Sequence, residues 1–146
     1  MVRLALAAAL LALPGAVFGS GFLALVASGA PAEVRAAIER GANVNERGDN
    51  GWTPLMIATR ENGNPEVISL LLASGARLED RDVLGHDALM VAPRSSPSPE
   101  VITELLQAGA DARLKSAEGK TAYELALGNS ALAGTRQLEE LRRAGQ

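Results

Sequence analysis

Apolar side chains recur at helical spacing through the middle of the chain. Val67, Leu70 and Leu71 lie three and four residues apart, and Val101 and Leu105 repeat that spacing further along. Positions three and four apart share one face of an α-helix, so each run predicts a helix with one buried face. Each run leads into a glycine, the residue that most often follows the last turn of a helix. The pattern therefore predicts a series of short amphipathic helices.

Small residues return along the chain at a constant interval. The glycines at positions 51, 85 and 119 are 34 residues apart, as are the Gly-Ala pairs at 41, 75 and 109 and the alanines at 58, 92 and 126. Independent markers that keep one register indicate internal repeats. Each repeat is then a unit that buries its apolar face against its neighbours.

Two helix-start signals divide each unit. Thr53 precedes Pro54 and can cap a first helix, because its side-chain oxygen accepts from backbone N–H groups where proline needs none. Asn64-Pro65-Glu66 and Ser98-Pro99-Glu100 predict the start of a second helix, each with a capping side chain, a proline and a carboxylate that the helix dipole favours. A unit is thus a turn, a short helix, a turn and a longer helix.

The period divides the chain into units at about residues 20–46, 47–80, 81–114 and 115–146. The first unit is predicted to hold helices over residues 22–28 and 31–40, and the last to end in a charged helix that keeps Leu138 and Leu141 for the core. In the third unit Pro93 falls where the first helix should still be running, so that helix should be shortened or kinked. The loop at residues 94–98 is then expected to project.

These units resemble ankyrin repeats. The turn glycine, the Thr-Pro-Leu at residues 53–55, the small-residue first helix, the apolar second helix and the Gly-Ala pair follow the family pattern, most closely over residues 66–76. The period departs from the family's value of about 33, and Met56, Met90 and Glu124 replace the usual histidine after Thr-Pro-Leu. The resemblance covers about residues 20–146. It implies an all-α solenoid of stacked helix–turn–helix units joined by β-turn fingers.

The first nineteen residues have the pattern of an export signal. Arg3 supplies the positive start, an apolar run follows over residues 4–13, and Pro14-Gly15 breaks it before an expected cleavage site at Ser20. We therefore expect export, to a bacterial periplasm or cell envelope.

An uncleaved membrane anchor is the alternative for this segment, since no charged residue lies between Arg3 and Glu33. The apolar run is, however, shorter than the roughly 20 residues that a spanning helix needs. A third possibility is an additional buried helix over residues 4–17.

Composition restricts the partner and the chemistry. A content of 47% hydrophobic but 3% aromatic residues suits a repeat stack with an alanine and leucine core. The net charge is −3, and the basic residues are interleaved with acids, so no basic stripe is present for a nucleic acid. There are no cysteines, which excludes disulfides and thiolate metal sites.

Candidate catalytic residues are scarce. His86 is the only histidine, and the adjacent Asp87 is expected to cap a helix rather than to form a catalytic pair with it. The acidic run at residues 79–82 fails as a calcium loop because Leu84 and Val91 occupy ligand positions. We expect no enzymatic activity, no cofactor and no metal.

The resemblance places partner binding on the turn tips and on the exposed side of the first helices, the concave face of the stack. Carried across by position, the candidate partner-binding residues are Asp49, Asn50, Trp52, Arg60, Glu61, Val83, Leu84, His86, Arg94, Glu118 and Lys120. Trp52 is the only tryptophan, a residue type that anchors interfaces, and packing against the next turn is its alternative role. Val83 and Leu84 cannot both reach the core from one turn, so they should form an exposed apolar pair.

The sequence thus predicts an exported, monomeric protein-binding module whose protein partner it does not name. A membrane-tethered scaffold is one alternative, with membrane contact only if the N-terminal segment is uncleaved. An enzyme or an enzyme accessory subunit is the other.

Overall fold

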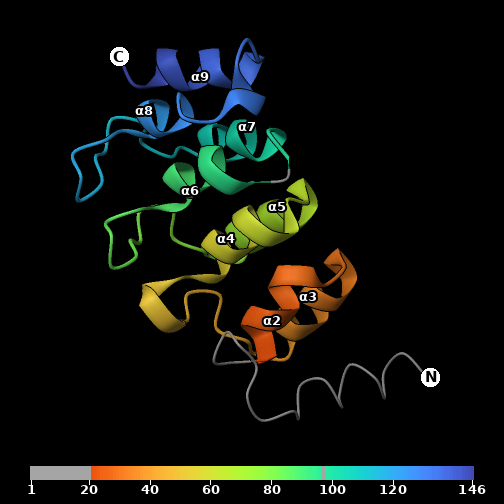
Figure 1. Ribbon diagram of the computed structural model, residues 1–146. Helices are drawn as coiled ribbons and strands as arrows, with labels where there is room; N and C mark the ends of the chain where they lie inside the picture. Colours follow the sequence, from red (N-terminus) through yellow and green to blue (C-terminus); the bar gives the residue numbers. More distant parts are fainter. Residues whose placement is uncertain (1–20, 97) are drawn as a thin grey trace.

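A computed structural model describes residues 21–96 and 98–146, without the side chain of Ser95. The predicted signal peptide and its cleavage site lie outside the described residues. The described chain is a stack of helix pairs, with Gly21 at one end and the C-terminus at the other (Figure 1). It contains helices, turns and no strand over these residues, which confirms the all-α prediction.

Each pair consists of a first and a second helix. The first helices are α2 (Gly21–Ser28), α4 (Pro54–Ile57) with its π-helical continuation η2 (Ala58–Asn62), α6 (Ala88–Ser95) and α8 (Ala122–Ala126). The second helices are α3 (Pro31–Glu39), α5 (Pro65–Ala73), α7 (Glu100–Gln107) and α9 (Arg136–Ala144). Two 3-10 turns, η1 (Asp49–Gly51) and η3 (Ser130–Leu132), lie in the connections.

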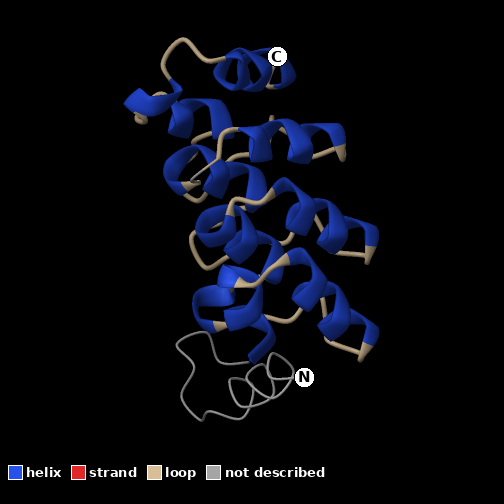
Figure 2. Ribbon diagram, turned by 90° about the vertical axis from the view of Figure 1, so that its right-hand side faces the viewer, coloured by secondary structure: helices blue, strands red, loops and turns tan. Residues whose placement is uncertain are grey.

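The helices form two rows along the stack (Figure 2). First helices pack on first helices, as α2 does on α4 and α6 on α8, and second helices pack on second helices from α3 through α9. The core lies between the rows, where Leu71, Leu105 and Leu141 are fully buried at equivalent positions. Leu138 is partly buried against this core. No helix in the described part of the chain is long and apolar enough to cross a membrane.

Side-chain caps start most of these helices as predicted. The Thr53 hydroxyl accepts from the Met56 N–H at 3.3 Å, the Asn64 side chain from the Glu66 N–H at 2.9 Å, and the Asp87 carboxylate from the Met90 N–H at 2.9 Å. The three polar side chains satisfy N–H groups that have no partner inside the helix.

The predicted cap at Ser98 is wrong. Helix α7 begins at Glu100, and Pro99 precedes it with near-helical backbone angles. The Ser98 hydroxyl donates to the Glu100 carboxylate at 2.6 Å and is therefore not used as a cap. The predicted proline and the first-turn carboxylate are present, but the serine binds the carboxylate instead of the helix end.

The predicted shortening at Pro93 is also wrong, because α6 runs through Pro93 to Ser95. A proline inside a helix removes one backbone N–H bond and crowds the carbonyl four residues earlier, but its φ angle is helical, and α6 accommodates it. The Asn129 side chain donates to the Pro93 carbonyl at 2.8 Å and satisfies a carbonyl near the end of this helix. Arg94 consequently lies on the helix and not in a projecting loop.

Loops joining one pair to the next project from the same side of the stack (Figure 1). We call residues 47–52, 81–86 and 115–120 the first, second and third finger. The Val83 N–H donates to the Asn50 carbonyl and the Ala117 N–H to the Leu84 carbonyl, each at 3.0 Å, so the fingers are held side by side. The glycine near the end of each finger has a φ of +73° to +77°, a left-handed conformation that explains why glycine recurs there.

Candidate functional site

The first finger and the helices behind it enclose a shallow hollow of about 240 Å³. Its lining brings together five of the predicted site residues, Asp49, Asn50, Trp52, Arg60 and Glu61. Leu23 and Ile57 contribute apolar surface from α2 and α4. The hollow thus combines residues from a finger with residues from the ends of first helices.

Trp52 is partly buried against the core and is covered on one face. The Arg60 guanidinium lies 5.0 Å from the centre of the Trp52 ring, and Arg60 pairs with Glu61 at 3.1 Å. A guanidinium over an indole face is attracted by the ring quadrupole. Trp52, Arg60 and Glu61 thus form one preformed group, in which Trp52 packs locally and is also partly accessible.

The second finger carries the exposed apolar pair that the sequence predicted. Val83 is 70% and Leu84 is 55% exposed at the tip of this finger. Neither residue lines the hollow of the first finger, although the Val83 N–H bond to Asn50 brings the two tips side by side. The site therefore consists of a hollow and an adjacent apolar tip.

His86 does not lie exposed at this tip, contrary to the prediction. The residue is only 4% exposed, and its Nδ1 lies 3.6 Å from Oδ2 of the buried Asp82. The ring turns under the finger because the Asp82 carboxylate is its polar neighbour there. Its Nε2 is buried without a hydrogen-bond partner in the described structure, and a buried position excludes His86 from direct contact with a partner.

Asp87, next to this pair, is a buried carboxyl whose pKa departs from its ordinary value. Burial raises the pKa of its carboxyl, opposed by the hydrogen bond from Met90 and by the charge of Arg81. The residue is 3% exposed and caps α6. Its environment reflects a structural cap, consistent with the expectation from the sequence.

The remaining predicted residues lie apart from the hollow. Arg94 is exposed near the C-terminal end of α6. Glu118 and Lys120 are exposed on the third finger and pair loosely at 3.7 Å. The predicted set therefore spans three fingers and the ends of two first helices rather than one pocket. Over the described residues no group of three or more acidic, histidine or cysteine side chains could hold a metal ion.

Comparison with known protein families agrees with this geometry. The family model for ankyrin repeats matches residues 22–116 as three copies. The chain belongs to the ankyrin-repeat family. Comparison with curated proteins gave no significant match. Ankyrin repeats imply a protein-binding module, which is typically not an enzyme.

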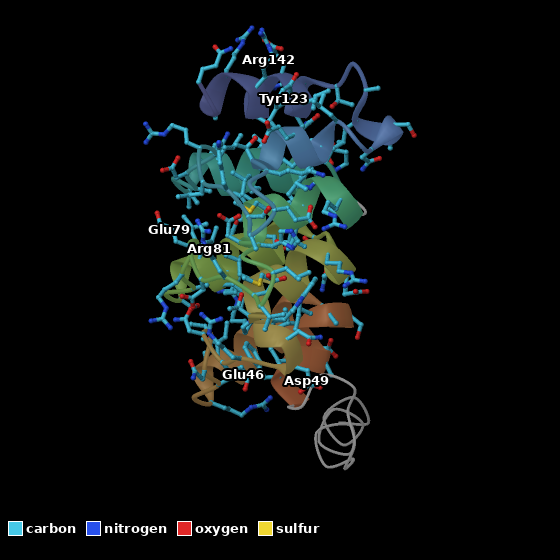
Figure 3. The ribbon with its side chains drawn as sticks, turned by 60° about the vertical axis from the view of Figure 1, so that its left-hand side comes forward. Glu46, Asp49, Glu79, Arg81, Tyr123 and Arg142 are labelled. Carbon is cyan, nitrogen blue, oxygen red and sulfur yellow. The ribbon has the colours of Figure 1, made fainter. Side chains whose placement is uncertain are left out.

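Hydrogen bonds from polar side chains that were not predicted from the sequence join neighbouring ankyrin repeats. The Arg47 guanidinium donates to the Arg81 carbonyl at 2.7 Å. The Arg81 guanidinium, labelled in Figure 3, donates in the same way to the Lys115 carbonyl at 2.8 Å. Asn45 donates to the Gly75 carbonyl and accepts from the Arg77 N–H, both at 2.9 Å. The 34-residue spacing of the basic positions 47, 81 and 115 is the signal that could have revealed the two arginine bonds.

Asp82 is a further residue whose structural role was not predicted from the sequence. Its Oδ1 accepts from the Leu84 N–H at 2.8 Å and from the His86 N–H at 2.9 Å, inside the turn that displays Val83 and Leu84. Ser116 occupies the equivalent place in the third finger, where its hydroxyl accepts from the N–H groups of Glu118 and Lys120. This repeat position holds Gly48, Asp82 and Ser116 in turn, so the sequence alone does not show that Asp82 and Ser116 share a role.

Proposed function

We propose that this ankyrin-repeat chain is an exported module that holds a protein partner against its fingers and first helices. The observation that carries the proposal is the pair of large apolar side chains, Val83 and Leu84, exposed together at a finger tip. Apolar surface surrounded by polar residues is typical of the centre of a protein contact. The hollow at Trp52, with its mixed polar and apolar lining, lies on the neighbouring first finger.

Capture experiments test this surface with a matched control. The mature protein is immobilised, partners are taken from an envelope extract, and a recovered partner is purified and its affinity measured. We expect Val83→Ala with Leu84→Ala to weaken binding at least tenfold, because removal of an apolar contact exposes both surfaces to water. Leu127→Ala should weaken binding much less, since Leu127 is also apolar and 59% exposed but lies at the end of α8 and not on a finger.

Thermal unfolding separates binding from folding in these variants. Both sets of changes remove exposed side chains, so their midpoints should stay close to that of the parent protein. A double variant that binds as well as the parent would remove the second finger from the site. Loss of binding in proportion to unfolding would assign Val83 and Leu84 a structural role.

Export is the second part of the proposal and is supported by the N-terminal sequence pattern alone. We expect a mature protein that begins at or near Ser20, because Pro14-Gly15 and Gly19 have the composition of a cleavage region. N-terminal sequencing of the exported protein measures this directly. Recovery of an intact Met1 terminus from the membrane fraction would instead support the membrane-tethered scaffold.

A further inference from the structure

The tip of the second finger is held from within by a buried carboxylate. Asp82 is buried, and its Oδ1 accepts from the Leu84 and His86 N–H groups at 2.8 and 2.9 Å. The backbone closes the same turn, since the Asp82 N–H donates to the His86 carbonyl and the Gly85 N–H to the Asp82 carbonyl, both at 3.0 Å. Hydrogen bonds to an ionised acceptor are about twice as strong as those between neutral groups.

Neither of the other two fingers has a carboxylate at this position. The Ser116 hydroxyl accepts the equivalent two N–H bonds at the longer distances of 3.3 and 3.4 Å, and Gly48, the equivalent residue of the first finger, has no side chain. The finger whose turn N–H groups make the shortest bonds to a side-chain acceptor is therefore the one that displays two exposed aliphatic side chains. That coincidence indicates that the turn is built to fix their direction.

Lateral contacts fix the tip further and limit how a partner can bind. The Val83 N–H donates to the Asn50 carbonyl, and the Leu84 carbonyl accepts from the Ala117 N–H, so neither group is free to bind a partner's backbone. A peptide that adds to a strand edge needs such backbone groups to be free. Recognition at this tip must therefore run through the two side chains.

In the described part of the chain, the hollow beside this tip is not an apolar cavity that would receive a partner's side chain. The neighbouring hollow of about 240 Å³ is lined by the polar residues Asp49, Asn50, Arg60 and Glu61 as well as by Leu23, Trp52 and Ile57, and it does not include Val83 or Leu84. It is smaller than the roughly 300–1,000 Å³ of ordinary ligand pockets. The projecting element here is the ankyrin finger, so the complementary cavity has to be on the partner.

We propose that Val83 and Leu84 form a preorganised aliphatic knob, positioned by the Asp82 carboxylate, that inserts into an apolar pocket on a folded partner protein. This inference rests on the proposed binding function and specifies its partner. A knob held in its bound conformation loses little conformational freedom on association, which favours affinity without additional contacts. Asp82 is a positioning residue, since it is buried and acts through the turn.

Amide hydrogen exchange tests the positioning step without any partner. In Asp82→Ala we expect exchange at Leu84 and His86 to accelerate about tenfold or more, because both N–H groups lose their acceptor. Asp82→Asn should restore most of the protection, since its amide oxygen can accept the same two bonds. Unchanged exchange in Asp82→Ala, or no recovery in a folded Asp82→Asn, would overturn the positioning role.

The purified partner tests the consequence for binding. Asp82→Ala should weaken binding about tenfold or more with Val83 and Leu84 intact, and Asp82→Asn should rescue it. Ser116→Ala makes the matched change in the third finger, and it should accelerate exchange at Glu118 and Lys120 while weakening binding much less than Asp82→Ala does. Equal losses in Asp82→Ala and Ser116→Ala would overturn the proposal. If Val83→Ala with Leu84→Ala abolishes binding but Asp82→Ala does not, the binding function stands and the preorganised knob is wrong.

The class of partner is tested with linear peptides that tile the captured protein. We expect the folded partner to bind and none of the peptides to bind in a way that depends on Val83 and Leu84, because a pocket exists only in the folded chain. A linear peptide that binds the parent but not the Val83→Ala, Leu84→Ala variant would overturn the knob-in-pocket inference and leave the binding function intact.

Discussion

At the scale of single residues, the fingers depend on backbone conformations that only glycine adopts readily. Gly85 has a φ of +73° and Gly119 a φ of +75°, so both occupy the left-handed region. Their surroundings differ: a Cβ atom on Gly85 would lie 2.9 Å from the Ala117 backbone nitrogen, whereas one on Gly119 would meet nothing within 4 Å. Glycine is therefore needed at position 119 only for its left-handed backbone conformation. At position 85 it is needed also because a Cβ atom would crowd the backbone of Ala117.

Alanine substitution should separate these two effects. We expect Gly119→Ala to destabilise the protein by about 1–2 kcal/mol, the cost of a left-handed conformation for a residue with a Cβ. Gly85→Ala should cost more, because the Cβ also pushes against the backbone of the third finger. Equilibrium unfolding in urea gives both values, and equal losses would show that the contact with Ala117 relaxes freely.

At the scale of the element, helix α9 closes the stack with charges that pair along its outer face. Glu139 accepts from Arg142 at 2.7 and 2.8 Å and from Arg143 at 2.9 Å, and these bonds lower the pKa of its carboxyl to about 2. Leu141 meanwhile fills the core beneath. The helix therefore presents paired charge outward and apolar surface inward, as a terminal unit must.

Acid titration should expose the contribution of Glu139. A carboxyl whose folded pKa is lowered stabilises the folded state above its unfolded pKa, and that contribution is lost as the pH falls from about 4.5 to about 2. We expect Glu139→Gln to lose less stability than the parent protein over this range. Glu39→Gln, an exposed change at the end of α3, is the control and should follow the parent curve. Identical acid curves for Glu139→Gln and the parent would mean that solvent screens the pairs completely.

At the scale of the whole molecule, each helix pair is stabilised chiefly by its neighbours, and asparagine side chains bridge pairs at both ends of the stack. Asn62 donates to the Val26 and Gly29 carbonyls at 2.9 and 3.0 Å, which ties the second pair to the end of α2. Asn129 donates to the Pro93 carbonyl at 2.8 Å and ties the fourth pair to α6. In a stack with nearest-neighbour coupling, the loss of either bridge should act locally.

Amide exchange in two matched variants measures this locality. Asn62→Ala should cost about 1–3 kcal/mol, since two partly buried carbonyls lose their donor, and should accelerate exchange mainly in α2. Asn129→Ala should leave α2 protected and accelerate exchange in α8 and η3 instead. A uniform increase along the whole chain in either variant would indicate that the stack opens as one unit.

The sequence by itself determined the repeat, the helical class and most of the caps, because these depend on local spacing and on side chains that act within a few residues. It also identified Val83 and Leu84 as exposed, since two adjacent branched side chains cannot both face the core. The positions of His86, Arg94 and Asp82 were decided by tertiary structure. His86 turned inward because Asp82 lies beneath the finger, and Arg94 stayed on a helix because α6 continues through Pro93. The bonds from Arg47 to Arg81 and from Asn62 to α2 join residues 33 to 36 positions apart, and contacts at such separation form only when one unit stacks on the next.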